Sequence, residues 1–237
     1  MSYHESLKEI LQIIDGGIIA SCQASCGEPL NAPIHINALA QSCLLGGAKA
    51  LRLEGIENID YVKMQTRVPI IGLTKDDISE ADKYHKVYIT RTINDALALK
   101  NAGCDLIAID ATIRYRGSDC DLKTLIDYIH NDLDLPVWAD IATYSEAINA
   151  SNLGCDIIST TLYGYTDETK AIATGPAFAL LEILARELTI PVVLEGQVST
   201  PDDIIVAFKS KAKAVVVGSA ITRPILITRK FVDACKK

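Results

Sequence analysis

The stretch of residues 135–159 indicates the fold of this chain. It consists of the run Leu135-Pro-Val-Trp-Ala-Asp140, the segment Tyr144–Asn152 and the run Gly154-Cys-Asp-Ile-Ile-Ser159. The two runs are short and apolar, as the buried strands of a parallel sheet are. The segment between them has the apolar spacing of an amphipathic helix. A strand, a helix and a second strand in this order predict one βαβ unit.

The same alternation continues along the rest of the chain, and two kinds of residue mark where its strands begin. Proline opens some strands, where its missing N–H is tolerated, and a helix-ending glycine precedes others. Lys211 stands where the next glycine would be, before a further apolar run, and this substitution predicts a different helix ending there. The prolines are Pro69, Pro136 and Pro191, and the glycines are Gly47, Gly103 and Gly154.

With Gly17-Ile-Ile-Ala-Ser21 at the front, we expect eight strands. Eight strand–helix units in 237 residues predict an α/β fold, namely a (β/α)8 or TIM barrel. We expect a single domain over residues 1–237, with residues 1–16 as an N-terminal helical extension. The extra run Lys86–Thr90 should decorate the loop after the third strand. A doubly wound open sheet would need a Gly-x-Gly-x-x-Gly turn, which the sequence lacks.

Composition narrows the class of protein further. A net charge of −7 without a long basic run argues against a nucleic-acid-binding surface. The seven cysteines follow no disulfide-framework spacing, which indicates a reducing compartment. The first residues lack the basic and apolar regions of a signal peptide, and no apolar stretch approaches the roughly 18 residues of a membrane span. We therefore expect a cytoplasmic protein without a membrane or nucleic-acid partner.

Ionisable side chains stand at the ends of several predicted strands, where a continuously apolar run would be typical. Charges are rarely buried unless they are paired, and a barrel gathers the carboxyl ends of its strands around one mouth. The sequence therefore predicts an active site at this mouth. The side chains are those of Arg52, Lys75, Asp110, Asp140 and Glu195.

A phosphate site is predicted at the last two strands of the barrel. Barrels often bind phosphate with the loops after strands 7 and 8 and the start of a short helix. Here these loops contain Gly196, then Gly218-Ser219 and Arg223. Glycines let backbone N–H groups approach the anion, the helix N-terminus favours negative charge, and arginine can bind phosphate in a bidentate manner.

The remaining residues indicate the type of reaction. Lys75 could act as a Schiff-base nucleophile or as a general base, with Glu195 as its partner acid or base. The four histidines lie outside the strand ends, so we expect neither a metal site nor a cofactor. Metal-free proton or carbonyl chemistry on a phosphorylated small molecule is the expectation that follows.

Several stretches, in this order and spacing, are together specific to a known family. The chain resembles the N-acylglucosamine-6-phosphate 2-epimerase family, the N-acetylmannosamine-6-phosphate epimerases of sialic acid catabolism. The stretches include Ile19-Ala-Ser-Cys-Gln23, Pro69-Ile-Ile-Gly-Leu-Thr-Lys75, Ile107-Ala-Ile-Asp110-Ala-Thr112, Ser159-Thr-Thr-Leu-Tyr-Gly-Tyr-Thr166 and Val216-Val-Gly-Ser-Ala-Ile-Thr-Arg223.

The resemblance implies a role for each matching residue. Lys75 and Glu195 match the catalytic pair, and Gln23, Arg52 and Asp140 match the positions that contact the sugar. Gly196, Gly218, Ser219 and Arg223 match the phosphate site, while Asp110 keeps a largely structural interpretation. The chain departs from the family in the residues directly after Arg52 and Lys75, where it has Leu-Glu-Gly and Asp-Asp-Ile.

The function that the resemblance implies is the interconversion of N-acetyl-D-mannosamine 6-phosphate and N-acetyl-D-glucosamine 6-phosphate (EC 5.1.3.9). Deprotonation and reprotonation at C2 would need no metal and no cofactor, and the resemblance also implies a homodimer. One alternative is a Schiff-base lyase that acts on a phosphorylated keto-acid through Lys75. Another is a non-catalytic barrel that binds a sugar phosphate, which would not need the Lys75–Glu195 pair.

Overall fold

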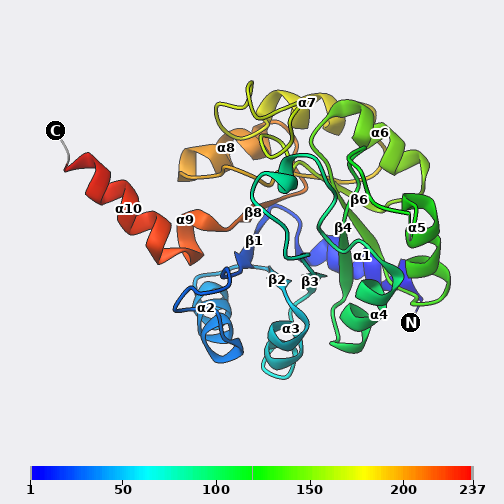
Figure 1. The fold of residues 1–237 in the computed structure, drawn as a ribbon, viewed down its shortest axis with the longest axis horizontal. Helices are drawn as coiled ribbons and strands as arrows, with labels where there is room; N and C mark the ends of the chain where they lie inside the picture. The colour runs from blue at the N-terminus through cyan, green and yellow to red at the C-terminus, as the bar shows by residue number, and fades with distance from the viewer. Residues whose placement is uncertain (1, 119, 236–237) are drawn as a thin grey trace.

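Eight parallel strands form one closed sheet in the computed structural model, which describes residues 2–118 and 120–235 (Figure 1). The order around the sheet is β7-β6-β5-β4-β3-β2-β1-β8, and a parallel bridge between Leu194 and Val215 joins its two edges. This arrangement confirms the predicted (β/α)8 barrel. The strands are β1 (Gly17–Cys22), β2 (Ala50–Glu54), β3 (Ile70–Leu73), β4 (Leu106–Asp110), β5 (Val137–Asp140), β6 (Ile157–Ser159), β7 (Val192–Val193) and β8 (Ala214–Val217).

Helices follow the strands in turn and surround the barrel (Figure 1). A short 3-10 helix, η1 (Asp82–Tyr84), lies between β3 and α4. The α-helices are α1 (Tyr3–Ile13), α2 (Pro33–Leu45), α3 (Ile56–Lys63), α4 (Ile93–Asn101), α5 (Leu122–Asn131), α6 (Tyr144–Asn152), α7 (Phe178–Glu187), α8 (Pro201–Lys209), α9 (Ser219–Thr222) and α10 (Pro224–Ala234).

Local sequence signals set where several of these helices begin and end. Thr143 and Thr200 each accept a hydrogen bond from a backbone N–H three residues later, and each is part of a capping box. Lys211 has a φ of 65°, in the same left-handed region as Gly154 at 100°. The prediction of a different helix ending at Lys211 is therefore wrong: the lysine takes the glycine's conformation, at a steric cost of about 1 kcal/mol.

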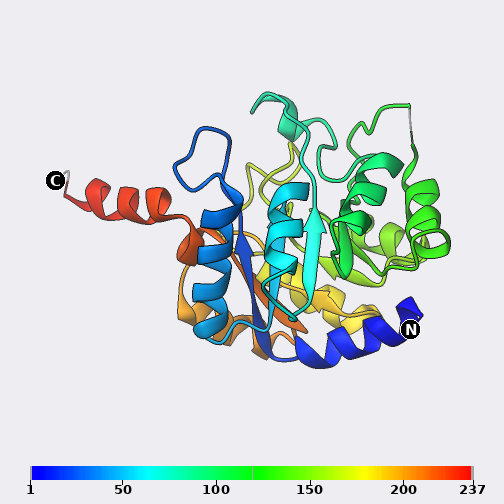
Figure 2. The ribbon, with the colours of Figure 1, turned by 90° about the horizontal axis from the view of Figure 1, so that it is seen from below.

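The apolar core has two layers, one outside and one inside the barrel. The outer layer packs the helices against the sheet, and the inner layer fills the barrel with alternate residues of the strands, Trp138 among them. Ile10, in the last turn of α1, and Ile14, just beyond its end, belong to the inner layer. Figure 2 shows α1 across one end of the barrel, opposite the end where the strands finish. Thus α1 closes the barrel floor and leaves the site at the other end.

No helix within residues 2–118 and 120–235 is both long enough and apolar enough to cross a membrane.

The closure of the barrel floor by α1 can be tested with two neighbouring isoleucines. Ile14 is completely buried, whereas Ile13 is 38% exposed. Ile14→Ala should lower the free energy of unfolding by about 2–5 kcal/mol, because it leaves a cavity in the inner core. Ile13→Ala is the control and should cost much less in urea denaturation. Equal losses for the two variants would contradict the assignment.

Candidate active site

A cavity of about 390 Å³ opens at the carboxyl ends of the strands. All of the residues predicted for the site except Asp110 and Asp140 line it, so the cavity brings together side chains from five strands or from the loops that follow them. Their individual roles remain predictions. The predicted residues that line the cavity are Gln23, Arg52, Lys75, Glu195, Gly196, Gly218, Ser219 and Arg223.

Arg52 forms the base of the site. It lies within β2 rather than at its end, so its side chain points into the barrel and is only 1% exposed. Its Nη2 is 2.5 Å from Asp140 Oδ2 and its Nε is 3.1 Å from Glu195 Oε1. The guanidinium carbon lies 5.9 Å from the centre of the Trp138 ring. Nη1 is buried without a hydrogen-bond partner among the described residues, and a ligand oxygen could satisfy it.

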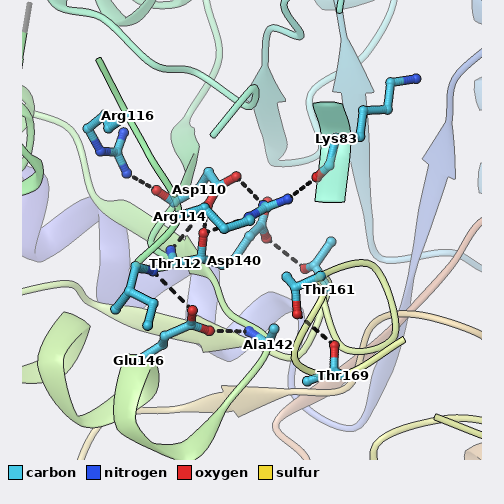
Figure 3. A network of polar contacts seen from close by, with 12 residues as sticks. Lys83, Asp110, Thr112, Arg114, Arg116, Asp140, Ala142, Glu146, Thr161 and Thr169 are labelled. Atoms are coloured by element: carbon cyan, nitrogen blue, oxygen red, sulfur yellow. Dashed lines mark hydrogen bonds and ion pairs between the residues drawn. The ribbon is translucent and has the colours of Figure 1, made fainter. Parts of the chain in front are cut away.

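Asp140 supports the site from below and does not line the cavity. Its carboxylate is completely buried, and its two oxygens face two different partners. Oδ2 pairs with Arg52, and Oδ1 accepts a hydrogen bond of 2.6 Å from Thr161 Oγ1 (Figure 3). Asp140 therefore positions Arg52 and Thr161, which line the cavity. Its direct contact with a sugar remains a prediction.

Glu195 follows β7 and is the carboxylate that faces the cavity. Ser159 and Thr161 place their hydroxyls 3.3 Å and 3.0 Å from its Oε2. Burial raises the pKa of Glu195 from 4.5 to about 7; Arg52 opposes this rise, and Asp140 adds to it. At neutral pH the carboxyl group is therefore present in both its protonated and its ionised form, so it can donate or accept a proton.

Lys75 lies two residues beyond β3, and its side chain is exposed in the cavity. Its Nζ donates to Gln23 Oε1 at 2.6 Å, and Gln23 Nε2 in turn donates to Ser21 Oγ at 2.9 Å. The amine is partly removed from bulk water, and this desolvation lowers the pKa of Lys75. The negative charge of Glu54 raises the pKa, and the positive charge of Arg52 lowers it. A lowered pKa increases the fraction of neutral amine, which is the form that can remove a proton.

Lys75 and Glu195 belong to opposite walls of the barrel. Three strands separate β3 from β7 in each direction: β4, β5 and β6 on one side, and β8, β1 and β2 on the other. A ligand in the cavity between them would present one face to the amine and the other face to the carboxyl group. This is the geometry that proton transfer on two faces of one carbon requires.

The loops after β7 and β8 form the other end of the cavity. Gly196 has a φ of 102°, and a side chain there would meet the Thr161 carbonyl oxygen at 3.2 Å. Arg223 lies at the start of α10 and pairs with Glu28. Lys230, on the exposed side of α10, also lines the cavity. This end therefore combines close backbone approach with positive charge, as a phosphate group requires.

Several residues of the site were not predicted from the sequence. Ser159 and Thr161 carry no charge, although Ser159 ends β6 as Asp140 ends β5, and this parallel could have identified it. Ser21 lies within β1 and carries no charge, and the others lie in loops or on α10, where no strand pattern indicates a position. The unpredicted lining residues include Ser21, Tyr88, Thr161, Tyr165 and Lys230.

Among the described residues, no three side chains of His, Cys, Asp or Glu converge in an arrangement that could hold a metal ion.

Comparison with known proteins gives a consistent result. The family model described as "Putative N-acetylmannosamine-6-phosphate epimerase" matches residues 36–237. A "Putative N-acetylmannosamine-6-phosphate 2-epimerase" of Clostridioides difficile (strain 630) is 45% identical over 225 residues, which cover 95% of this chain and 98% of the relative. A solved structure of the N-acetylmannosamine-6-phosphate 2-epimerase from Clostridium perfringens is 39% identical, with a TM-score of 0.88, over 95% of this chain and 96% of that chain.

The hydroxyl of Thr161 provides a test of the electrostatics at Glu195. The Thr161 hydroxyl lies between Asp140 Oδ1 and Glu195 Oε2, and when its one proton points to the ionised Glu195 carboxylate it favours the charged form and lowers the pKa of Glu195. Thr161→Val should therefore raise this pKa above about 7, whereas Thr161→Ser, which keeps a hydroxyl, should leave it near the wild-type value. Carbon-13 NMR titration of the glutamate carboxyl groups measures both. An unchanged or lower pKa in the valine variant would contradict the assignment.

Proposed function

The chain belongs to the N-acetylmannosamine-6-phosphate epimerase family, and we propose that it interconverts N-acetyl-D-mannosamine 6-phosphate and N-acetyl-D-glucosamine 6-phosphate. The protein is then an isomerase that inverts the carbon bearing the acetamido group. The observation that carries this proposal is the placement of Lys75 and Glu195 on opposite walls of one cavity. Both groups have pKa values displaced toward neutrality, as proton transfer in both directions requires.

The phosphate group anchors the substrate at the end of the cavity formed after β7 and β8. Backbone N–H groups near Gly196 and Gly218, the Ser219 hydroxyl and the Arg223 guanidinium are the binding groups in this proposal. The binding energy of this remote group is used to hold C2 between the two catalytic side chains. Gln23 and Arg52 contact the sugar, and Asp140 holds Arg52 in place.

Proton transfer takes place on the open-chain sugar, in which C2 is adjacent to the C1 aldehyde. Neutral Lys75 removes the C2 proton, and the electron pair of the C–H bond moves onto O1 to form an enolate. The protonated carboxyl of Glu195 then delivers a proton to the opposite face of C2, which restores the aldehyde with inverted configuration. In the reverse reaction Glu195 removes the proton and the Lys75 ammonium returns one, so the two directions share one site.

Arg52 stabilises the negative charge that develops on O1. Its Nη1 is a buried donor without a hydrogen-bond partner among the described residues, and the enolate oxygen would complete its hydrogen bonding. A donor fixed in advance in a buried position stabilises developing charge more than water does. Asp140 and Glu195 keep the guanidinium in position, so the group need not reorganise during the reaction.

We also propose a cytoplasmic location and a role in amino-sugar and sialic acid catabolism. A phosphorylated sugar is charged and does not cross a bilayer unaided, so an enzyme that acts on it belongs where the sugar is phosphorylated.

The proposal further includes a homodimer in which the two copies meet at α10. This helix projects away from the barrel, and none of its residues is buried (Figures 1 and 2). Ile225, Phe231 and Val232 expose 41%, 72% and 49% of their surface. Exposed apolar side chains gathered on one element support a contact with another protein chain.

Two variants and one trapping reagent test the reaction. Lys75→Ala and Glu195→Gln should each lower the rate of epimerisation by about 10²–10⁴-fold while the protein stays folded, because each loses one proton-transfer group. Proton NMR of the two sugar phosphates measures the rate in both directions. A Schiff-base lyase would form an imine that borohydride reduces onto Lys75, and we expect no such adduct. Full turnover by Lys75→Ala, or a trapped adduct, would contradict the mechanism.

The dimer has its own test. Sedimentation equilibrium should give a dimer for the wild-type protein and a monomer for Phe231→Asp, which buries a charge in the proposed contact. Met64→Asp is the matched control, because Met64 is equally exposed at 68% but lies at the end of α3, and this variant should remain a dimer. A monomeric wild-type protein, or a dimeric Phe231→Asp variant, would refute the proposed interface.

A further inference from the structure

A second buried ion pair lies at the end of β4, outside the cavity. Asp110 is completely buried, and its Oδ2 is 2.5 Å from Nη2 of Arg114, whose side chain is 7% exposed. Oδ1 of Asp110 accepts hydrogen bonds from the Thr112 backbone N–H at 3.1 Å and from its hydroxyl at 2.6 Å. The carboxylate therefore has a full set of partners, and it fixes the position of the guanidinium beside it.

The free edge of Arg114 faces a different segment of the chain. Its Nη1 donates a hydrogen bond to the backbone carbonyl of Lys83, and its Nε donates to Thr112 Oγ1 at 2.9 Å. Its guanidinium carbon lies 5.6 Å from the centre of the Tyr88 ring. Figure 3 shows the guanidinium between Asp110 and Lys83. Arg114 thus connects the rigid end of β4 to the segment that follows β3.

That segment carries Lys75. Lys75 and Ile89 form an antiparallel bridge, the Asp76 N–H donates to the Tyr88 carbonyl at 2.8 Å, and the Thr90 N–H donates to the Thr74 carbonyl at 3.1 Å. The two arms of residues 74–90 are therefore paired like a hairpin. Tyr88 and Ile89 line the cavity on the second arm, directly opposite Lys75 on the first. A shift of Tyr88 would be passed on to the Lys75 backbone.

Arg114 is not among the residues that line the cavity, so it acts from behind the cavity wall. Its side chain is planar and has several donors, which lets one group contact a carboxylate, a carbonyl and an aromatic ring together. A lysine has a single ammonium group and cannot span the same partners. A displacement of about 1 Å at a catalytic group can lower a rate by as much as 100-fold. Loss of the Arg114 contacts should therefore lower the rate of the reaction.

We propose that Arg114, held by Asp110, is a positioning residue for Lys75: it fixes the hairpin of residues 74–90 against β4 and so sets where the amine stands in the cavity. The proposal rests on the proton-transfer role of Lys75 given above. It also gives Asp110 a function, because the carboxylate is the fixed point from which the hairpin is held.

The test compares Arg114 with Arg116, a neighbour in the same loop. Arg116 donates to the backbone carbonyl of Asp110, and the described structure gives it no contact with Lys83 or Tyr88. Arg114→Ala should lower kcat by about 10- to 100-fold with a smaller change in KM. Arg116→Ala should leave kcat within about twofold of the wild-type value, even if it lowers the melting temperature as much as Arg114→Ala does. Equal effects of the two variants on kcat would overturn the proposal.

Arg114→Ala removes the charge partner of Asp110 and could prevent folding. Arg114→Lys is a second variant that tests the proposal in a folded protein. The lysine keeps a positive charge beside Asp110, so the protein should melt near the wild-type temperature, yet kcat should still fall by about tenfold or more. Wild-type kcat in a folded Arg114→Lys variant would show that the charge alone matters and would overturn the proposal.

A measurement without substrate separates this inference from the proposed function. The rate at which an amine-reactive reagent modifies Lys75, followed by peptide mass spectrometry against pH, reports the position and protonation of the amine directly. The profile should change in Arg114→Lys and remain as in the wild type in Arg116→Ala. Unchanged labelling of Lys75 in Arg114→Lys would refute the positioning role. A wild-type protein that does not epimerise either sugar phosphate would refute the proposed function instead.

Discussion

The buried Arg52 guanidinium is the constraint on which the site depends. A charge in the barrel interior is tolerated only with partners, and removing one partner of such a pair typically costs about 3–5 kcal/mol. Asp140 and Glu195 supply the opposite charges, and they come from the ends of two other strands. The need to pair one arginine therefore ties β2, β5 and the residues after β7 into a fixed geometry. These ion pairs hold the residues at the base of the cavity together.

The same cluster sets the chemistry of its neighbours. Burial beside Asp140 raises the pKa of Glu195 to about 7, and the nearby Arg52 helps to lower that of Lys75. An acid and a base whose pKa values move toward each other can exchange roles without a large change in free energy. A reversible epimerisation requires this property, because each direction uses the base of the other as its acid.

The sequence predicts the barrel well because its strands repeat one physical pattern: an apolar run with a proline or glycine before it and a polar residue after it. Lys75 and Glu195 could be identified because charged residues are unexpected after buried strands. Asp140 shows the limit of that reasoning, since a strand-end carboxylate can face a buried arginine instead of the cavity. Thr161 and Arg114 could not be predicted from strand ends, because their roles depend on contacts between segments far apart in sequence. Even Lys211 was misread, since a lysine can adopt the backbone of a glycine.

In the proposed reaction, two groups on opposite sides of C2 exchange their protons with solvent, one removing a proton from C2 and the other delivering one. Proton NMR of early turnovers in D₂O, started from N-acetylmannosamine 6-phosphate, tests it most directly. The N-acetylglucosamine 6-phosphate formed should carry deuterium at C2 from the first turnovers, because the group that delivers the proton is not the group that removed one. Product that retains protium at C2 would contradict proton transfer by two exchangeable groups.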